Sequence, residues 1–206
     1  MNLPDSIKAI QRAVGAFPDG IFGPVTASRV LLEIASRGES FGAMEAAESL
    51  GKDLDERTIR NIVTLDPKAR ERFMQFSRLA KATAATLGCD YVMIDGNRTW
   101  EEQDQVYAQG RTLPGARVTQ AKGGQSNHNF GIAGDFGVFQ GKAYLDTTNP
   151  ELAAKVHRAC SLHAERCGLE WGGSWQSFTD QPHYEIKNGL TMMQKRNVYK
   201  ARGSVL

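Results

Sequence analysis

The sequence is organised around ten residues past the middle of the chain, Ser126-Asn127-His128-Asn129-Phe130-Gly131-Ile132-Ala133-Gly134-Asp135. A helix could not easily bring His128 and Asp135 to one ion, because residues seven apart on a helix are separated by about 10.5 Å along its axis. Each ligand of a metal ion such as zinc must lie about 2 Å from it. Two glycines in the stretch also disfavour a helix. We therefore expect a turn followed by a strand that starts near Ile132.

The predicted strand places Asp135 on the same face as Ala133 and Gly137, because side chains alternate along a strand. Both neighbours are very small, so we expect open space above Asp135 for an ion and a substrate. The stretch therefore predicts a metal site with His128 and Asp135 as two of its ligands.

Composition limits the classes of protein that the chain can belong to. Its 206 residues are 41% hydrophobic and 23% charged, which fits one soluble domain, or one domain and a small module. Residues 1–56 carry 5 basic and 9 acidic side chains, a net of −4, and the remainder carries 20 and 14, a net of +6. This excess is too small to indicate nucleic acid, and no apolar run reaches the roughly 18 residues of a membrane span. We expect neither partner.

The start of the chain and its cysteines predict where it is made. The first residues lack the basic head and apolar run of a secretory signal. Three cysteines do not form a disulfide framework. We therefore expect synthesis in a reducing cytoplasm and no signal peptide.

A small helical module is predicted at the N-terminus. Residues 6–15 form one amphipathic pattern, and Pro24 suits the first turn of a second helix. Between them lies the octad Phe17-Pro18-Asp19-Gly20-Ile21-Phe22-Gly23-Pro24. Over residues 3–37 this order resembles the small peptidoglycan-binding domain found beside many wall hydrolases. The resemblance implies a wall-binding module and linker over residues 1–58, with candidate contacts Asp19, Phe22 and Thr26; alternatively, these residues only build the turn.

The rest of the chain, residues 59–206, shows alternating helix and strand signals. Asp66-Pro67 and Asn149-Pro150 each have the form of an N-cap followed by a first helical residue. Thr99 and Glu102 form a capping box. We expect helices over about 67–87, 100–109, 150–167 and 190–201, and strands at 91–94, 132–138 and 183–187. On the third helix Cys160 and Cys167 are too far apart for one ion and predict a core stripe, and His157 predicts a packing or surface histidine.

A second polar segment supplies the remaining groups for catalysis. It reads Asp180-Gln181-Pro182-His183-Tyr184-Glu185. A catalytic zinc ion typically has three nitrogen or oxygen ligands from the protein and an open fourth position. His183 would be the third ligand. Zinc makes water more acidic and nucleophilic, and Asp180 is placed to act as general base. Arg98, at a strand-to-helix corner, could stabilise the oxyanion. The alternatives are a structural zinc site filled by protein ligands, or histidines that only pack.

Three separated motifs, R-T-x-x-E-Q, S-x-H-x-x-G-x-A-x-D and D-x-P-H, occur in that order between residues 98 and 183. They resemble the zinc peptidases of the D-alanyl-D-alanine carboxypeptidase and L-alanyl-D-glutamate endopeptidase group, over about residues 60–187. The resemblance implies an α+β fold, with a small antiparallel sheet and flanking helices that carry the site. It implies that His128, Asp135 and His183 bind Zn²⁺ and that Asp180 acts as the general base. It also implies that Arg98 stabilises the oxyanion and that Ser126 and Gln103 contact the substrate.

The segment Glu170-Trp171-Gly172-Gly173-Ser174-Trp175 resembles the phage endolysin branch of that group. Trp171 and Trp175 either line the substrate groove or pack in the core. The resemblance predicts a monomeric endolysin that stays in the host cytoplasm until it is released to the wall, where it cleaves peptidoglycan at L-Ala–D-Glu. The alternatives are a D-Ala-D-Ala carboxypeptidase and a non-catalytic zinc-containing wall-binding protein.

Overall fold

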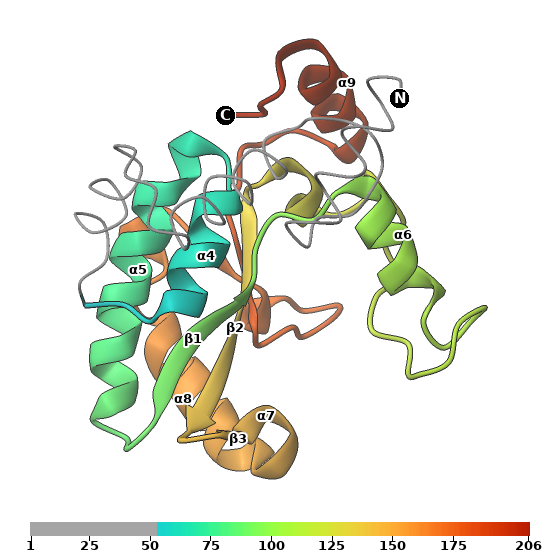
Figure 1. Ribbon diagram of the computed structural model, residues 1–206. Helices are drawn as coiled ribbons and strands as arrows, with labels where there is room; N and C mark the ends of the chain where they lie inside the picture. Colours follow the sequence, from blue (N-terminus) through green and yellow to red (C-terminus); the bar gives the residue numbers. More distant parts are fainter. Residues whose placement is uncertain (1–52) are drawn as a thin grey trace, which may run out of the picture.

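A small antiparallel sheet lies at the centre of the computed structural model, which describes residues 53–206 (Figure 1). Its strands are β1 (Asp90–Asp95), β2 (Ala133–Gln140), β3 (Ala143–Tyr144), β4 (Glu170–Trp171) and β5 (His183–Glu185). They are ordered β1-β2-β5-β4, and β3 also pairs with β2. The predicted α+β class is thus confirmed. The predicted N-terminal module, with Asp19, Phe22 and Thr26, lies outside the described residues.

Helices surround the sheet on several sides. In Figure 1, α4 and α5 lie to one side of β1, α6 lies to the other side of the sheet, and α9 lies at the top. The helices are α4 (Glu56–Thr64), α5 (Pro67–Ala85), α6 (Trp100–Ala108), α7 (Leu145–Thr148), α8 (Pro150–Ser161) and α9 (Met192–Arg202). Short 3₁₀ helices are η1 (Asn127–Phe130), η2 (Glu165–Cys167) and η3 (Gly172–Ser174). Within residues 53–206, no helix has the length and apolar character needed to cross a bilayer.

Local sequence signals fix where the main helices begin. The Asp66 side chain accepts a hydrogen bond from the Lys68 amide at the start of α5, and Asn149 does the same for Leu152 in α8. Both halves of the predicted capping box form in α6, between Thr99 and Glu102. Such caps satisfy amide groups that a helix leaves unpaired at its first turn.

The main core lies between one face of the sheet and helices α5 and α8. On that face the rings of Tyr91, Phe136 and Tyr184 surround Phe76 of α5, with Phe76–Tyr184 centroids 4.4 Å apart. Val156 and Cys160 of α8 are buried in the same cluster, as expected for a core stripe. Because side chains alternate along β2 and β5, the residues between these aromatic ones point to the opposite face. That second face carries the candidate site.

Helix α4 covers the free edge of the sheet at β1. The Thr58 hydroxyl accepts from the Met93 amide at 2.9 Å, and the Asn61 side-chain amide donates to the Met93 carbonyl at 2.7 Å. Arg57 also donates to the Ile94 carbonyl. Side chains of α4 thus pair backbone groups that an edge strand would otherwise expose. The domain division predicted between residues 58 and 59 falls inside this helix.

Candidate metal centre

Strand pairing brings two of the expected ligands face to face. Asp135 of β2 lies directly opposite His183 of β5, as neighbours in antiparallel register. Directly opposed residues have Cβ atoms only about 4.5–5.5 Å apart, so their side chains meet on the same face of the sheet. Two residues 48 positions apart in sequence therefore converge because of one strand pair.

The third residue, His128, comes from the short helix η1 that leads into β2. The Ser126 hydroxyl caps η1 by accepting from the His128 amide at 3.3 Å. The chain leaves η1 through Gly131, whose φ of +67° is left-handed and whose missing Cβ would lie 2.5 Å from the Asp66 amide nitrogen. A side chain would be strained there and would clash with the backbone. The turn followed by a strand that the sequence predicted is confirmed.

Three ligand atoms form a small triangle on the second face of the sheet. His128 Nε2 lies 3.2 Å from Asp135 Oδ1 and 3.3 Å from His183 Nδ1, and the Asp135–His183 side measures 2.9 Å. In a tetrahedral zinc site with bonds of about 2.0–2.1 Å, neighbouring ligand atoms lie about 3.3–3.4 Å apart. The triangle would have to open by only a few tenths of an ångström to match that spacing.

The second nitrogen of each histidine is already occupied by an acceptor. His128 Nδ1 lies 2.6 Å from the Gly96 carbonyl oxygen, and His183 Nε2 lies 3.0 Å from Glu185 Oε2. Each of these nitrogens must donate, because a carbonyl or carboxylate oxygen only accepts. In the neutral form that binds a metal, each imidazole then presents a lone pair at its other nitrogen. Two nitrogen lone pairs and a carboxylate oxygen therefore face one another, and a shared cation satisfies all three.

Charge around the triangle also favours a cation. Burial opposes ionisation of Asp135, but the two histidines beside it outweigh burial and hold the pKa of this carboxyl well below its usual value. Burial alone would lower the pKa of His183, yet Asp135 and Glu185 raise it to about 10. Two carboxylates thus place negative charge around the imidazoles. The donor set of two nitrogens and one oxygen is the kind that zinc prefers.

Arg98 lies at the corner between β1 and α6, as predicted, and its guanidinium is held in place. It contacts Gln103 Oε1 at 2.8 Å, Asp95 Oδ2 at 2.9 Å and Asp135 Oδ2 at 3.5 Å. The positive group therefore lies beside the oxygen of Asp135 that does not face the histidines. Its side chain is only 14% exposed, so these contacts are weakly screened.

Gln103 is buried and hydrogen-bonded through both atoms of its side-chain amide. Its side chain is 0% exposed. Its amide donates to the Ala121 carbonyl at 2.8 Å while its oxygen accepts from Arg98. In this arrangement Gln103 fixes Arg98 and ties the loop after α6 to the site. The substrate contacts expected of Gln103 and Ser126 stay predictions.

Asp180 lies on the turn that precedes His183, whose amide donates to the Asp180 carbonyl at 3.3 Å. Its half-buried carboxyl is close enough to the site to sense Asp135, His183, His128 and Arg98 electrostatically. Burial, followed by the charge of Asp135, raises its pKa above the ordinary value. A carboxyl with a raised pKa can both accept and return a proton nearer neutral pH.

Trp171 and Trp175 lie in different surroundings. Trp171 packs against the main core and donates from Nε1 to the Gln181 carbonyl at 2.7 Å. The Trp175 ring lies 5.2 Å from the His183 ring, between centroids, and its Nε1 donates to Glu170. Trp171 therefore packs against the core, and the Trp175 ring lies next to a candidate ligand; the substrate contacts expected of both stay predictions.

The structure corrects one sequence-based expectation and, for His157, agrees with the packing alternative and adds its partners. The space above Gly137 is filled, because a Cβ there would lie 2.7 Å from the Tyr144 ring; the sequence gives no sign that a residue of the next strand folds back over it. His157 is fully buried and bonded, with Nε2 2.7 Å from Asp146 Oδ1 and Nδ1 2.8 Å from the Tyr91 hydroxyl. Its partners could not be identified from the sequence.

Comparisons with known proteins show similarity to peptidases. Residues 119–186 match the profile of a peptidase M15 family described as D-alanyl-D-alanine carboxypeptidase. The chain is 40% identical over 111 residues to the peptidoglycan L-alanyl-D-glutamate endopeptidase CwlK of Bacillus subtilis (strain 168). That alignment covers 52% of this chain and 66% of the relative, slightly less than two thirds of its length.

Among solved structures, the L-Ala D-Glu endopeptidase ChiX of Serratia marcescens has 21% sequence identity and a TM-score of 0.44. The match covers 64% of this chain and 87% of that one. The matched region 119–186 includes η1, β2 and β5, and hence the three converging residues. The region of this chain that carries His128, Asp135 and His183 is thus similar to peptidases of the M15 family.

Proposed function

We propose that this chain is a zinc-dependent peptidase that hydrolyses the L-Ala–D-Glu bond in the stem peptide of peptidoglycan. The observation that carries the proposal is the convergence of three acceptor atoms within 2.9–3.3 Å of one another, each histidine being held by an acceptor at its other nitrogen. The choice of bond is supported by the 40% identity with CwlK, whose name states that activity.

His128 Nε2, Asp135 Oδ1 and His183 Nδ1 would hold the ion. When bound there, zinc would supply Lewis acidity toward the peptide carbonyl and the attacking water. The fit rests on donor chemistry and spacing, which suit a site with three protein ligands and one open position.

The protein's own side chains then divide the remaining work. The Asp180 carboxyl takes a proton from the attacking water and returns it to the leaving amine, a role that suits a carboxyl of raised pKa. Arg98 holds Asp135 in place through its second oxygen and supplies positive charge where the oxyanion develops. The Trp175 ring beside His183 excludes water from one side of the site.

The decisive experiment identifies the bond that is broken. Purified peptidoglycan is treated with the full chain, its glycan strands are cut with a muramidase, and the fragments are analysed by mass spectrometry. We expect stem peptides with a new D-Glu N-terminus and muramyl fragments that keep only L-Ala. A strong chelator should stop their release and added zinc should restore it. Release that survives the chelator would contradict the proposal.

The same experiment separates a second candidate, a D-Ala-D-Ala carboxypeptidase. The description of the family matched by residues 119–186 favours this alternative. A carboxypeptidase would release free D-Ala from pentapeptide stems and leave the L-Ala–D-Glu bond intact. A chain that bound zinc and peptidoglycan but released neither product would instead be a non-catalytic wall-binding protein.

Wall targeting by the N-terminal segment belongs to the same proposal. Its support is the octad 17–24, which resembles peptidoglycan-binding domains. A chain of residues 53–206 should cleave soluble muropeptides as well as the full chain but bind less to insoluble peptidoglycan in a pull-down assay. Equal binding by both chains would remove the targeting role.

A further inference from the structure

A line of buried polar side chains runs from the C-terminal helix α9 to the metal centre. Lys195 of α9 donates from Nζ to Asn127 Oδ1 at 2.7 Å, and Asn127 Nδ2 donates to Glu185 Oε2 at 2.6 Å. The same carboxylate oxygen lies 3.0 Å from His183 Nε2. We name Lys195, Asn127 and Glu185 the relay; its members come from α9, η1 and β5.

The hydrogen bonds of the relay can be donated in only one direction. An ammonium group only donates and a carboxylate only accepts, so the Asn127 amide must turn its oxygen to Lys195 and its nitrogen to Glu185. The carboxylate of Glu185 then requires a proton on His183 Nε2. In the neutral ring that binds a metal, this proton leaves the lone pair of His183 on Nδ1, the atom that faces His128 and Asp135.

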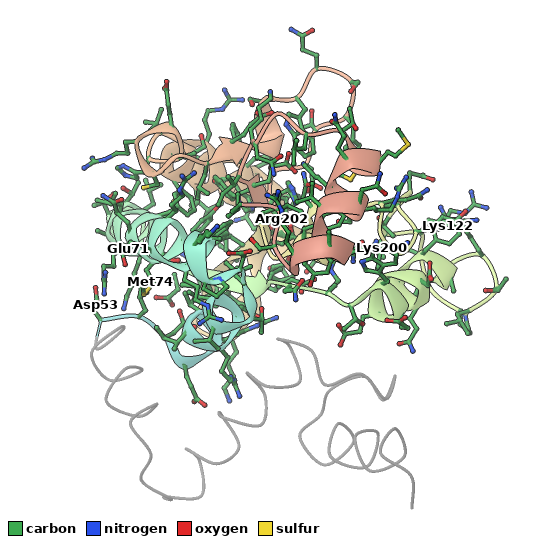
Figure 2. The ribbon with its side chains drawn as sticks, turned by 90° about the horizontal axis from the view of Figure 1, so that it is seen from above. Asp53, Glu71, Met74, Lys122, Lys200 and Arg202 are labelled. Carbon is green, nitrogen blue, oxygen red and sulfur yellow. The ribbon has the colours of Figure 1, made fainter. Side chains whose placement is uncertain are left out.

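Lys195 is buried, although lysine is rarely buried unless its charge is paired. Only 6% of this lysine is exposed, although it lies in a helix whose other basic residues reach the surface. Burying an ammonium group is costly unless a compensating charge and hydrogen bonds are present. Glu185 supplies that charge, and Asn127 bridges the two groups. By contrast, Lys200 and Arg202 of the same helix, both labelled in Figure 2, are exposed.

We propose that Lys195 and Asn127 are positioning residues for the metal centre, which act through Glu185 to hold His183 in its ligating orientation and tautomer. Neither residue touches the reacting atoms. They hold the Glu185 carboxylate in place, and this carboxylate orients the His183 imidazole. The C-terminal helix therefore contributes to metal affinity from outside the sheet. Outer partners of metal-bound histidines change metal affinity by about 10–100-fold when they are removed. This inference rests on the proposed metal site.

The test measures zinc affinity of the full chain by competition with a chromophoric chelator. Lys195→Met and Asn127→Leu should each weaken zinc binding about tenfold, and Glu185→Gln should weaken it more, because it contacts His183 directly. Lys195→Arg, which keeps the charge, should recover part of the loss. The matched control is Lys200→Met, on the exposed side of the same helix, whose affinity should stay within about twofold of the parent chain.

A second readout separates positioning from a general loss of structure. Proton NMR of the zinc-loaded chains should show a slowly exchanging Nε2 proton of His183 in the parent chain and a faster-exchanging one in Asn127→Leu. If Lys195→Met does not fold, Asn127→Leu and Lys195→Arg decide the question by the same two measurements. Folded relay variants that bind zinc as tightly as Lys200→Met would overturn the inference while leaving the metal site in place. Failure of the parent chain itself to bind zinc would instead overturn the proposed function, and the inference with it.

Discussion

Two groups of polar side chains lie on opposite faces of the same sheet, and each pairs a histidine with an aspartate. On one face, His128, Asp135 and His183 form the candidate metal site, which we call the metal cluster. On the other face, Asp146, His157, Tyr91 and Tyr184 form what we call the buried chain. Residue types alone do not distinguish them, yet they differ in where their protons lie.

In the buried chain every donor has an acceptor. Tyr184 lies 3.0 Å from Tyr91 between hydroxyl oxygens, Tyr91 lies 2.8 Å from His157 Nδ1, and His157 Nε2 lies 2.7 Å from Asp146 Oδ1. Protons donated in that order satisfy each atom in turn. Burial also raises the pKa of Tyr91, which keeps its hydroxyl protonated. The group is complete without a ligand and fits a structural role.

In the metal cluster the acceptors converge instead. Each histidine turns one nitrogen to an outside acceptor, Gly96 or Glu185, so its other nitrogen and one Asp135 oxygen converge on one position. The comparison teaches that a metal site is recognised by the direction of its donors and acceptors, more than by a count of histidines and acids. Four substitutions test this difference, from the largest expected effect to the smallest.

Asp135→Asn should have the largest effect. The amide keeps the shape of the carboxyl but loses the charge that faces both histidines, so zinc affinity should fall by more than the roughly 10–100-fold typical of outer partners. Peptidoglycan hydrolysis should fall in parallel. Chelator competition and fragment release measure the two losses, and zinc affinity equal to that of the parent chain would remove Asp135 from the ligand set.

Asp180→Asn should come next, because it leaves all three proposed ligands in place. Loss of the general base should lower kcat by about 10²–10⁴-fold, while zinc affinity should stay within about twofold. Single-turnover hydrolysis of a purified muropeptide measures the first quantity, and chelator competition measures the second. Undiminished hydrolysis would exclude Asp180 from the mechanism.

His157→Phe should show the opposite pattern, with loss of stability and an intact metal cluster. It removes the partner of Asp146 Oδ1 and one of the two partners of the Tyr91 hydroxyl, which should cost about 2–3 kcal/mol of unfolding free energy. Urea denaturation followed by tryptophan fluorescence gives this value. A zinc affinity that dropped as far as in Asp135→Asn would break the distinction between the two groups.

Tyr184→Phe should have the smallest effect, about 1 kcal/mol of stability. It removes the hydroxyl at the end of the buried chain, where Tyr91 still keeps His157 as a partner. Tyr184 is the immediate neighbour of His183 in the sequence. This variant therefore also tests whether zinc affinity depends on closeness in the sequence or on the face of the sheet. Unchanged zinc affinity is expected, since the two side chains lie on opposite faces.

Much of the local structure could be predicted from the sequence. Caps such as Asp66, Thr99 and Asn149 act within three residues, so their sequence patterns and their hydrogen bonds coincide. The turn at Gly131 and the strand after it followed from spacing and glycine content. Candidate ligands 48 and 55 residues apart were proposed together through the family motifs, which carry information that periodicity alone lacks.

Partners that depend on packing could not be predicted in this way. Lys195 meets Asn127 across 68 residues, and His157 meets Tyr91 across 66. Nothing in the neighbouring sequence identifies the partner of either residue. The position of Glu185 could be predicted in part, because residues two apart on a strand share a face and Glu185 lies two residues after His183. Hydrogen-bond partners of this kind are set by how helices dock on the sheet, which no local pattern encodes.

The cover that α4 provides over β1 has a practical consequence for handling this protein. A shortened chain that began at residue 59 would lack Thr58, Arg57 and the Asp55 cap of the helix. The Met93 amide would then face solvent in a strand able to pair with the same strand of another molecule. Such a chain should form intermolecular sheets on concentration, and a start at residue 53 should keep it dispersed.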